Sequence, residues 1–168
     1  MRLEPLFDGE LVYDEAAHTA VAPYGDDRWF GYTPAHGLIE GPRIRGTGRC
    51  HNLYSQLRSN PDLYRPHYRG AIETDDGALV LFDAAGFNRF EGLLGRVIMH
   101  MTFQTSTDRY AWLNETMAAA EANCYAVEEG LETERWTLHA FEIVHDLQNE
   151  SRRVGSTTDR PTKFEGPG

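Results

Sequence analysis

The chain has 168 residues and a formal net charge of −10 at pH 7, from 16 basic and 26 acidic residues. Lys163 is the only lysine, so nearly all of the positive charge is arginine. An acidic chain lacks the cationic face that displaces counterions from phosphates, which argues against a nucleic-acid-binding protein and against a polybasic membrane anchor. The length fits one domain, and 40% hydrophobic residues suffice for a buried core.

The apolar runs of the sequence are short, Ala78–Phe82 being an example, and none is long enough to span a bilayer as a helix. The first residues do not combine a basic start with an apolar stretch, so we expect no signal peptide. We therefore expect a cytoplasmic protein that binds neither nucleic acid nor membrane.

Short runs that alternate apolar and polar residues between turn residues predict β-strands along most of the chain. The clearest strand is Ala78–Phe82, and the turn sequence Asp75–Gly77 before it predicts an antiparallel hairpin with Arg69–Thr74. The alternation returns over Arg96–Thr105 and Arg135–Val144. Many short strands at this spacing favour a closed barrel or a sandwich over a β-α-β fold.

Residues Asp108–Glu129 give conflicting signals. Their alanine-rich run Met117–Ala122 favours a helix, which Asp108 would cap and Gly130 would stop. Tertiary context overrides propensity, so helix and strand both stay open here. Residues 149–168 are polar and contain glycine and proline, which predicts a C-terminal arm or tail after a single domain of residues 1–148.

Four segments together resemble a known bacterial family. They are, in chain order, LEPLF (Leu3–Phe7), IEGPRIRG (Ile39–Gly46), ETDDGALV (Glu73–Val80) and RYAWLN (Arg109–Asn114). In this order and spacing they are similar to domain-of-unknown-function family 3237, over roughly residues 3 to 144. The resemblance implies an all-β fold, a closed antiparallel lipocalin-like or calycin-like barrel around a cavity, with at most one or two short helices. It also implies that Trp112–Met117 is largely extended, and it implies no activity.

Familiar catalytic motifs are missing from the sequence: it contains no glycine-rich nucleotide loop, no H-E-x-x-H and no G-x-S-x-G. The seven histidines form no H-x-H or H-x-x-x-H pair, so we expect neither a metal site nor a cofactor. Cys50 and Cys124 have no C-x-x-C spacing and are expected to be reduced, buried thiols. His51 follows Cys50 directly, but adjacent residues of a strand point to opposite faces.

Two predicted strands each carry several polar side chains on one face: His67, Arg69, Glu73 and Asp75 on the first, and Arg96, His100, Thr102 and Gln104 on the second. If these faces point inward, the cavity holds histidine, arginine and carboxylate groups in an apolar enclosure. A histidine there is a suitable general base, and an arginine stabilises an oxyanion or enolate. The alternative is that both polar faces point to water.

The segment RYAWLN allows two interpretations as well. If it is extended, Trp112 and Asn114 share a face and can orient a planar ligand. Alternatively, Arg109 pairs with Asp75 or Asp76 in the hairpin turn, and Trp112 plugs the end of the barrel.

We predict a cofactor-independent enzyme with proton-transfer chemistry of the lyase, isomerase, cyclase or hydratase type, acting on an aromatic or carbonyl-bearing metabolite. The predicted catalytic residues are His67 or His100 as acid and base, with Arg69 or Arg109 holding an anionic intermediate. The predicted substrate-binding residues are Tyr68, Glu73, Arg96, Trp112, Asn114 and Arg43. The alternatives are a non-catalytic small-molecule-binding barrel and a structural or assembly protein. Under each of these we expect a homodimer or a higher homo-oligomer.

Overall fold

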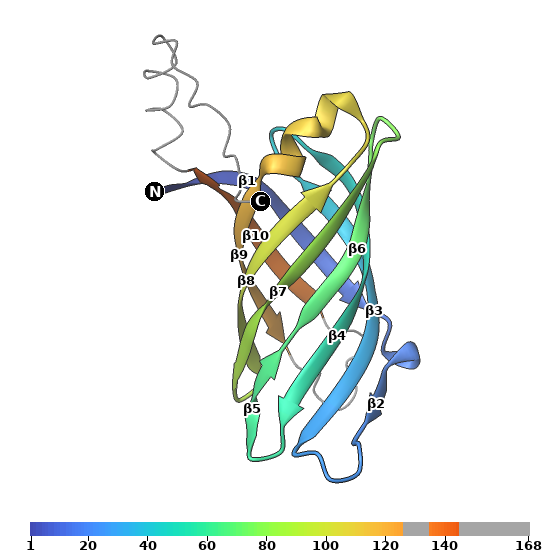
Figure 1. The fold of residues 1–168 in the computed structure, drawn as a ribbon, viewed down its shortest axis with the longest axis vertical. Coiled ribbons are helices and arrows are strands. Elements are labelled where there is room, and N and C mark those ends of the chain that lie inside the picture. The colour runs from blue at the N-terminus through green and yellow to red at the C-terminus, as the bar shows by residue number, and fades with distance from the viewer. Residues whose placement is uncertain (126–134, 145–168) are drawn as a thin grey trace, which may run out of the picture.

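The computed structural model describes residues 1–125 and 135–144, and it consists mainly of antiparallel strands (Figure 1). The strands are β1 (Arg2–Tyr13), β2 (Thr19–Val21), β3 (Arg28–Glu40), β4 (Arg45–Leu57), β5 (Asn60–Arg65), β6 (His67–Thr74), β7 (Leu79–Glu91), β8 (Leu94–Gln104), β9 (Met117–Tyr125) and β10 (Arg135–Val144). Two short 3-10 segments accompany them in the described ranges, η1 (Glu15–Ala17) and η2 (Asp108–Glu115). The predicted mainly-β fold is confirmed.

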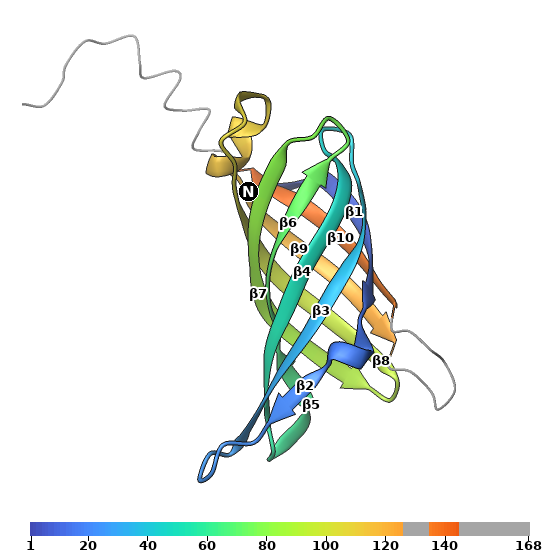
Figure 2. The same cartoon turned by 90° about the vertical axis from the view of Figure 1, so that its right-hand side faces the viewer.

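Eight of the strands pair in a closed ring, in the order β3, β1, β10, β9, β8, β7, β6 and β4, with β4 returning to β3. β2 pairs with β3 beside the ring, and β5 bridges β4 and β7. Figures 1 and 2 show the ring from two sides, with η2 at its upper end and the β2 and β5 extensions at its lower end. We call these two ends the upper end and the lower end below.

The predicted hairpin of Arg69–Thr74 with Ala78–Phe82 is confirmed as the pair β6 and β7. In its turn, the Gly77 N–H donates to the Thr74 carbonyl at 2.8 Å, and the Thr74 N–H donates to the Ala78 carbonyl at 2.9 Å. Gly77 has a φ of +80°, which L side chains rarely adopt, so the turn requires glycine at this position. The alternating segments predicted as later strands form β8 and β10.

Residues Asp108–Tyr125 divide into a helical and an extended part. The expectation that Trp112–Met117 is largely extended is wrong, because the 3-10 segment η2 continues to Glu115. Tyr110 and Leu113 are the buried residues of η2, and their side chains pack the segment against the upper end of the ring. Packing of apolar side chains therefore decides the local conformation here.

The alanine-rich run forms strand β9, although its composition favours a helix. Ala118, Ala120 and Ala122 are buried in the interior of the ring, where their small side chains leave room for larger neighbours. Tertiary packing overrides helix propensity in this run. The suggested stop at Gly130 lies outside the described residues.

Alternation along each strand separates an inner from an outer face of the ring. On β4 and β8, buried and exposed residues alternate almost without interruption. The upper half of the interior is fully buried, with Leu6, Ile44, Val80 and Leu113 at 0–1% exposure. The interior is thus a packed apolar core beneath η2.

The predicted tail of residues 149–168 lies outside the described residues. In the part of the chain that the structure describes, no helix combines the length and the apolar character that crossing a bilayer requires.

Candidate functional site

Inward-facing residues that are far apart in the sequence meet at the lower end of the ring. Because neighbouring strands are antiparallel, the last residues of β7 and β9 lie beside the first residues of β8, and the last residues of β1 and β9 lie beside the first residues of β10. The first residues of β6 lie beside the second half of β4. The inward side chains that these positions bring together include Tyr13, Tyr68, Asn88, Cys124 and Trp136, all of them buried. We call these five residues the inner polar cluster.

Tyr13 and Tyr68 form a hydroxyl pair at the centre of the cluster. Their hydroxyl oxygens are 2.6 Å apart and buried, and both rings pack on Trp136, with ring centroids 5.2 and 5.7 Å from the indole. Burial, and then the neighbouring Tyr13, raise the pKa of Tyr68 well above its ordinary value. Tyr68 therefore stays protonated and can donate a hydrogen bond at neutral pH.

Trp136 and Asn88 contribute polar atoms that no described group satisfies. The Asn88 amide donates through Nδ2 to the Cys124 sulfur at 3.5 Å. The indole Nε1 of Trp136 and the Oδ1 of Asn88 are buried and have no hydrogen-bond partner within residues 1–125 and 135–144. Buried polar groups are ordinarily paired, so these two atoms are the candidates for hydrogen bonds to a bound molecule.

The remaining interior is neutral. Among the residues whose burial the structure describes, the buried polar side chains are Thr33, Asn52, Thr74, Asn88 and Thr116, and none of these is ionisable. The middle of the ring is filled by side chains and leaves an apolar void of about 20 Å³ beside Tyr68 and Trp136, room for roughly one water molecule. A ligand would therefore sit at the lower end and not in the middle of the ring.

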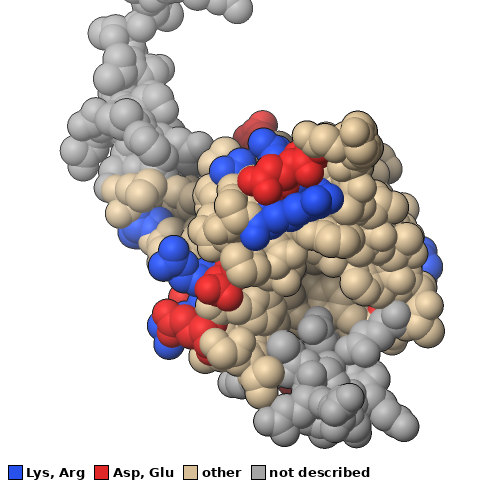
Figure 3. All heavy atoms as spheres, turned by 90° about the horizontal axis from the view of Figure 1, so that it is seen from below, with Lys and Arg blue, Asp and Glu red and all other residues tan. Residues whose placement is uncertain are grey.

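Aromatic rings continue from the cluster towards solvent. The ring centroids of Tyr54 and Tyr64 are 5.5 Å apart, and those of Tyr64 and Phe90 are 5.3 Å apart. Gly31 lies beneath the Tyr54 ring and leaves the space that this ring occupies. Figure 3 looks onto this end from below: the described surface is hollowed there, and most residues around the hollow are uncharged. The lower end thus offers an aromatic, neutral entrance.

The face of β6 that carries His67 and Arg69 points away from the interior. This is the alternative stated above, in which the polar face is directed towards water. The His67 Nε2 atom is 2.9 Å from the Asp83 carboxylate, and the Arg69 Nε donates to the same carboxylate at 2.7 Å. Burial acts to raise the pKa of Asp83, but hydrogen bonds and charge from His67 and Arg69 outweigh it, and the pKa is lowered. Tyr68, between them in the sequence, points inward.

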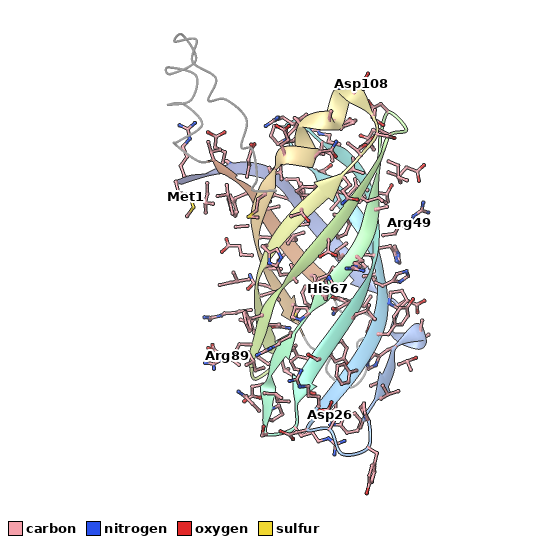
Figure 4. All side chains as sticks on the ribbon, viewed as in Figure 1. Met1, Asp26, Arg49, His67, Arg89 and Asp108 are labelled. Carbon is pink, nitrogen blue, oxygen red and sulfur yellow. The ribbon has the colours of Figure 1, made fainter. Side chains whose placement is uncertain are left out.

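The second polar face is also an outer face. His100 is exposed on β8, and the Arg96 Nη2 atom is 3.6 Å from the Glu91 carboxylate. Glu73 on β6 is 3.8 Å from Arg49, and the labelled Arg49 projects away from the ring in Figure 4. An inward arrangement of these residues is therefore not found, and their predicted roles stay untested.

Residues of η2 fasten this segment to the hairpin turn. The Arg109 Nη1 donates to Asp76 at 2.7 Å, and the Tyr110 hydroxyl donates to the same carboxylate at 3.0 Å. A hydrogen bond from Thr74, together with Tyr110 and Arg109, lowers the pKa of Asp76. This is the structural alternative for Arg109, in which it pairs with an aspartate of the turn.

Asn114, Trp112 and Arg43 also make contacts within the fold. The Asn114 side chain accepts from the Thr105 N–H at 2.7 Å and donates to the Thr105 carbonyl at 3.0 Å. The Arg43 guanidinium lies 3.4 Å from the centre of the Trp112 ring and 3.0 Å from Glu142. Trp112 packs against the core, as expected of a plug at the end of the ring.

The outer surface has a larger hollow of about 1040 Å³ over β1, β3, β4, β6, β7 and β8. It is open to solvent, and several of its polar side chains already have protein partners. Asp83 binds His67 and Arg69, as described above, and the His51 Nδ1 atom is 2.9 Å from the Tyr32 hydroxyl. We therefore favour the inner polar cluster as the candidate site, because its Trp136 Nε1 and Asn88 Oδ1 atoms are buried without a hydrogen-bond partner among the described residues.

Cys50 and His51 point to opposite faces, as expected for adjacent residues of a strand. Burial raises the pKa of the Cys50 thiol to about 12, so this cysteine is not a nucleophile at neutral pH. Cys50 and Cys124 are both buried thiols that form no disulfide, as predicted. Within the described ranges, no three His, Cys, Asp or Glu side chains converge where a metal ion could bind.

Sequence reasoning found Tyr68 but missed Tyr13, Asn88 and Trp136. One signal was available: each of these residues shares the apolar face of its strand near a strand end. In an antiparallel ring, such positions converge.

Comparisons with known proteins agree with this architecture. Residues 1–143 match a family described as "Protein of unknown function (DUF3237)". No curated protein matches the chain.

Solved structures with a similar fold include a β-barrel-like protein from Acinetobacter baumannii, at 20% identity and a TM-score of 0.66, covering 83% of this chain and 95% of that one. A conserved protein of unknown function from Rhodopseudomonas palustris has 18% identity and a TM-score of 0.67, covering 85% and 97%. A third, described as an enzyme from Penicillium herquei, has 20% identity and a TM-score of 0.55, covering 82% and 93%. At these identities the likeness concerns the fold.

Proposed function

Because the chain belongs to DUF3237, a family of proteins of unknown function, its activity must be inferred from its own residues, and we propose that it catalyses a cofactor-independent proton transfer on a neutral aromatic or carbonyl-bearing small molecule at the lower end of the ring. The observation that carries the proposal is the buried hydroxyl pair of Tyr13 and Tyr68 beside the indole of Trp136. In an otherwise apolar interior, these groups are hydrogen-bond donors that can meet an oxygen of a ligand.

The hydroxyl pair suits the stabilisation of developing negative charge. A protonated tyrosine whose pKa is raised donates to a carbonyl oxygen as that oxygen becomes an enolate or phenolate, and it does so in a water-poor site where hydrogen bonds are strong. Because no Asp, Glu, His, Lys or Arg side chain is buried among the residues whose burial the structure describes, the proton acceptor is a hydroxyl of the substrate or a water molecule. Isomerisation, cyclisation, hydration and lyase-type cleavage fit this arrangement.

The fold supports the same proposal. Closed pairing of eight strands suits a lipocalin-like barrel that admits its ligand at one end. The neighbour from Penicillium herquei is described as an enzyme, so a chain of this fold can serve catalysis.

The proposal is tested by a thermal-shift screen of neutral aromatic ketones and phenols against aromatic carboxylates. Neutral compounds are expected to raise the melting temperature, because a ligand that binds only the folded state stabilises it. Carboxylates are expected to have no effect, because no buried cation is described that would pair with them.

The compounds that bind are then incubated with the wild type and with Tyr68→Phe without any added cofactor, and products are detected by mass spectrometry. Turnover that Tyr68→Phe retains in full, or a screen in which carboxylates alone bind, contradicts the proposal.

A second candidate is a protein that binds the same molecules without transforming them. The lack of a buried Asp, Glu or His side chain in the described core, which leaves no strong general base there, favours it. It predicts thermal shifts from the same neutral compounds but no product from any of them.

The expected homo-oligomer, the cytoplasmic location and the lack of nucleic-acid and membrane partners stay predictions. Phe87 and Ile98 support self-association, because they lie opposite each other on the outer face with 55% and 71% exposure. Light scattering during gel filtration measures the oligomeric state directly.

A further inference from the structure

The two polar atoms of the inner polar cluster without described partners have opposite hydrogen-bonding character. The Trp136 Nε1 can only donate, and the Asn88 Oδ1 can only accept. Both residues are 4% exposed, so neither atom is offered to bulk water. A buried donor and a buried acceptor without partners are both costly to the folded chain.

Packing fixes where these two atoms lie. The Trp136 ring is held between the rings of Tyr13 and Tyr68, whose hydroxyls bind each other. The Asn88 amide is held through its Nδ2 by Cys124, and Cys124 is the direct cross-strand partner of Trp136. The Trp136 donor and the Asn88 acceptor therefore lie on either side of Cys124, on the inner face of the ring.

The wall between them is recessed. Gly95 lies opposite Cys124 on the neighbouring strand, and a Cβ atom at Gly95 would meet the Cys124 sulfur and the Asn88 Oδ1. The lack of a side chain at Gly95 thus makes the space in which the amide and the thiol lie. The arrangement is set by residues on the inner faces of four adjacent strands, β7, β8, β9 and β10.

From this geometry we propose that the ligand carries both a hydrogen-bond acceptor, received by Trp136 Nε1, and a hydroxyl donor, received by Asn88 Oδ1. This inference rests on the proposed function and narrows its substrate class to neutral aromatic hydroxy-ketones. A carboxylate cannot take the place of the hydroxyl, because it has only hydrogen-bond acceptors and would offer no donor to the Asn88 oxygen.

Four neutral probes of similar size test the inference: hydroxyacetylnaphthalene, with a hydroxyl and a ketone, its methyl ether, acetylnaphthalene with the ketone alone, and ethylnaphthol with the hydroxyl alone. Dissociation constants are measured with the full-length protein by calorimetry or by the fluorescence of the naphthalene. The hydroxy-ketone is expected to bind about tenfold more tightly than each of the other three, because each of them leaves a buried protein atom unpaired.

Two variants assign the contacts. Trp136→Phe removes the indole N–H and keeps an aromatic ring, so the hydroxy-ketone and ethylnaphthol should bind it with equal affinity. Asn88→Leu removes the acceptor at similar size, so the hydroxy-ketone and its methyl ether should bind it equally. In Trp136→Phe the hydroxyl of the probe should still strengthen binding, and in Asn88→Leu the ketone should still do so. A variant that only disturbed the packing would weaken the binding of every probe alike.

Three outcomes overturn the inference. Equal affinity of the wild type for all four probes refutes it and leaves the proposed function standing. A uniform loss across all probes in both variants also refutes it, since the residues would then act only through packing. Failure of every probe to bind the wild type refutes the inference and the proposed function together. If a variant does not fold, the comparison of probes on the wild type still decides.

Discussion

The hydroxyl oxygens of Tyr13 and Tyr68 lie 2.6 Å apart inside the ring, although 55 residues separate them in the chain. Tyr13 ends β1 and Tyr68 is the second residue of β6, so the contact crosses the interior between two strands that do not pair with each other. It is one of the few polar contacts in a core that is otherwise apolar, and its loss has a measurable cost.

Tyr68→Phe should lower the free energy of unfolding by about 1 kcal/mol, because a buried neutral hydrogen bond is removed while the ring is kept. Tyr13→Phe should cost a similar amount, and the double variant should cost less than the sum of the two, because both changes remove the same bond. Urea denaturation measures all three. Tyr32→Phe is the matched control, since its hydroxyl binds His51 on the exposed surface, and its effect should stay within about 0.5 kcal/mol. If the losses in free energy of unfolding from Tyr13→Phe and Tyr68→Phe add fully in the double variant, the hydrogen bond between the two hydroxyls is contradicted.

Substitutions of the outward-facing histidines should leave ligand binding unchanged. His100 is exposed, and His67 is held against Asp83 on the outer face. His67→Gln and His100→Gln should bind hydroxyacetylnaphthalene within about twofold of the wild type, whereas Asn88→Leu should lose about tenfold. Calorimetry with the same preparations makes the comparison. A loss in either histidine variant that equals the loss in Asn88→Leu would place the binding site on the outer face of the ring and contradict the inner polar cluster.

Local patterns in the sequence predicted the strands but not which polar residues face inward. On β6 the alternation separates His67 and Arg69 from Tyr68 and Ile72, and both sets contain groups capable of chemistry. The apolar set faces inward because burial of unpaired charge is costly, and this argument was available from the sequence. The charged set was nevertheless given the catalytic roles, and Tyr68 was the one member of the inner polar cluster among the predicted site residues.

Contacts across the ring could not be predicted in the same way. The approach of Tyr13 to Tyr68 depends on closure of the ring between β1 and β10, and no local pattern encodes that pairing. The 3-10 conformation of η2 has a similar origin, because Leu113, at 0% exposure, is buried by tertiary packing. Sequence periodicity fixes faces within a strand, whereas the register between distant strands depends on the whole fold.

Both cysteines should resist thiol reagents in the folded protein. Burial raises the pKa of Cys50 to about 12, and Cys124 is 1% exposed. Ellman's reagent at neutral pH should label neither thiol in the folded state and both in denaturant. Leu53→Cys is the matched control, because residue 53 lies on the outer face of the same strand as Cys50 with 48% exposure, and it should react at once. Rapid labelling of Cys50 would show that the interior opens readily.

Asp83 should make part of the stability dependent on pH. Its pKa is lowered in the folded protein, so its ion pairs contribute fully above the ordinary carboxyl range and are lost as pH falls through the lowered pKa. Asp83→Asn should therefore be less stable than the wild type near neutral pH, and the difference should shrink below about pH 4. The carboxylate is 38% exposed, and solvent screening keeps the effect small.

Arg69→Gln tests the cause of this pH dependence. It removes a hydrogen bond to Asp83, so the pKa of Asp83 should rise towards its ordinary value. Urea denaturation between pH 2.5 and 7, with NMR titration of the carboxyl carbon, measures both quantities. A difference between Asp83→Asn and the wild type that grows as the pH falls would contradict the assigned sign.

Gly95 should be intolerant of even the smallest side chain. A Cβ atom there would meet the Cys124 sulfur and lie 2.8 Å from the Asn88 Oδ1 and 3.0 Å from the Phe90 ring. Gly95→Ala should therefore lower the free energy of unfolding by about 1–3 kcal/mol and weaken the binding of hydroxyacetylnaphthalene, because the amide and the thiol must both move. Urea denaturation and calorimetry measure the two effects.

Two comparisons separate this crowding from a general cost of replacing glycine in a strand. Gly9→Ala places a Cβ 3.1 Å from the flexible end of Ile39 and away from Asn88, so its cost should be smaller and binding should be retained. Adding Cys124→Ala to Gly95→Ala removes the sulfur that a Cβ would meet, so part of the stability should return. If Gly95→Ala is as stable as Gly9→Ala and binds the probe as the wild type does, the packing of Asn88 and Cys124 over Gly95 does not limit the site. If Gly95→Ala loses stability and probe binding, and Cys124→Ala partly restores the stability, then the position of the Asn88 oxygen depends on the space that Gly95 leaves.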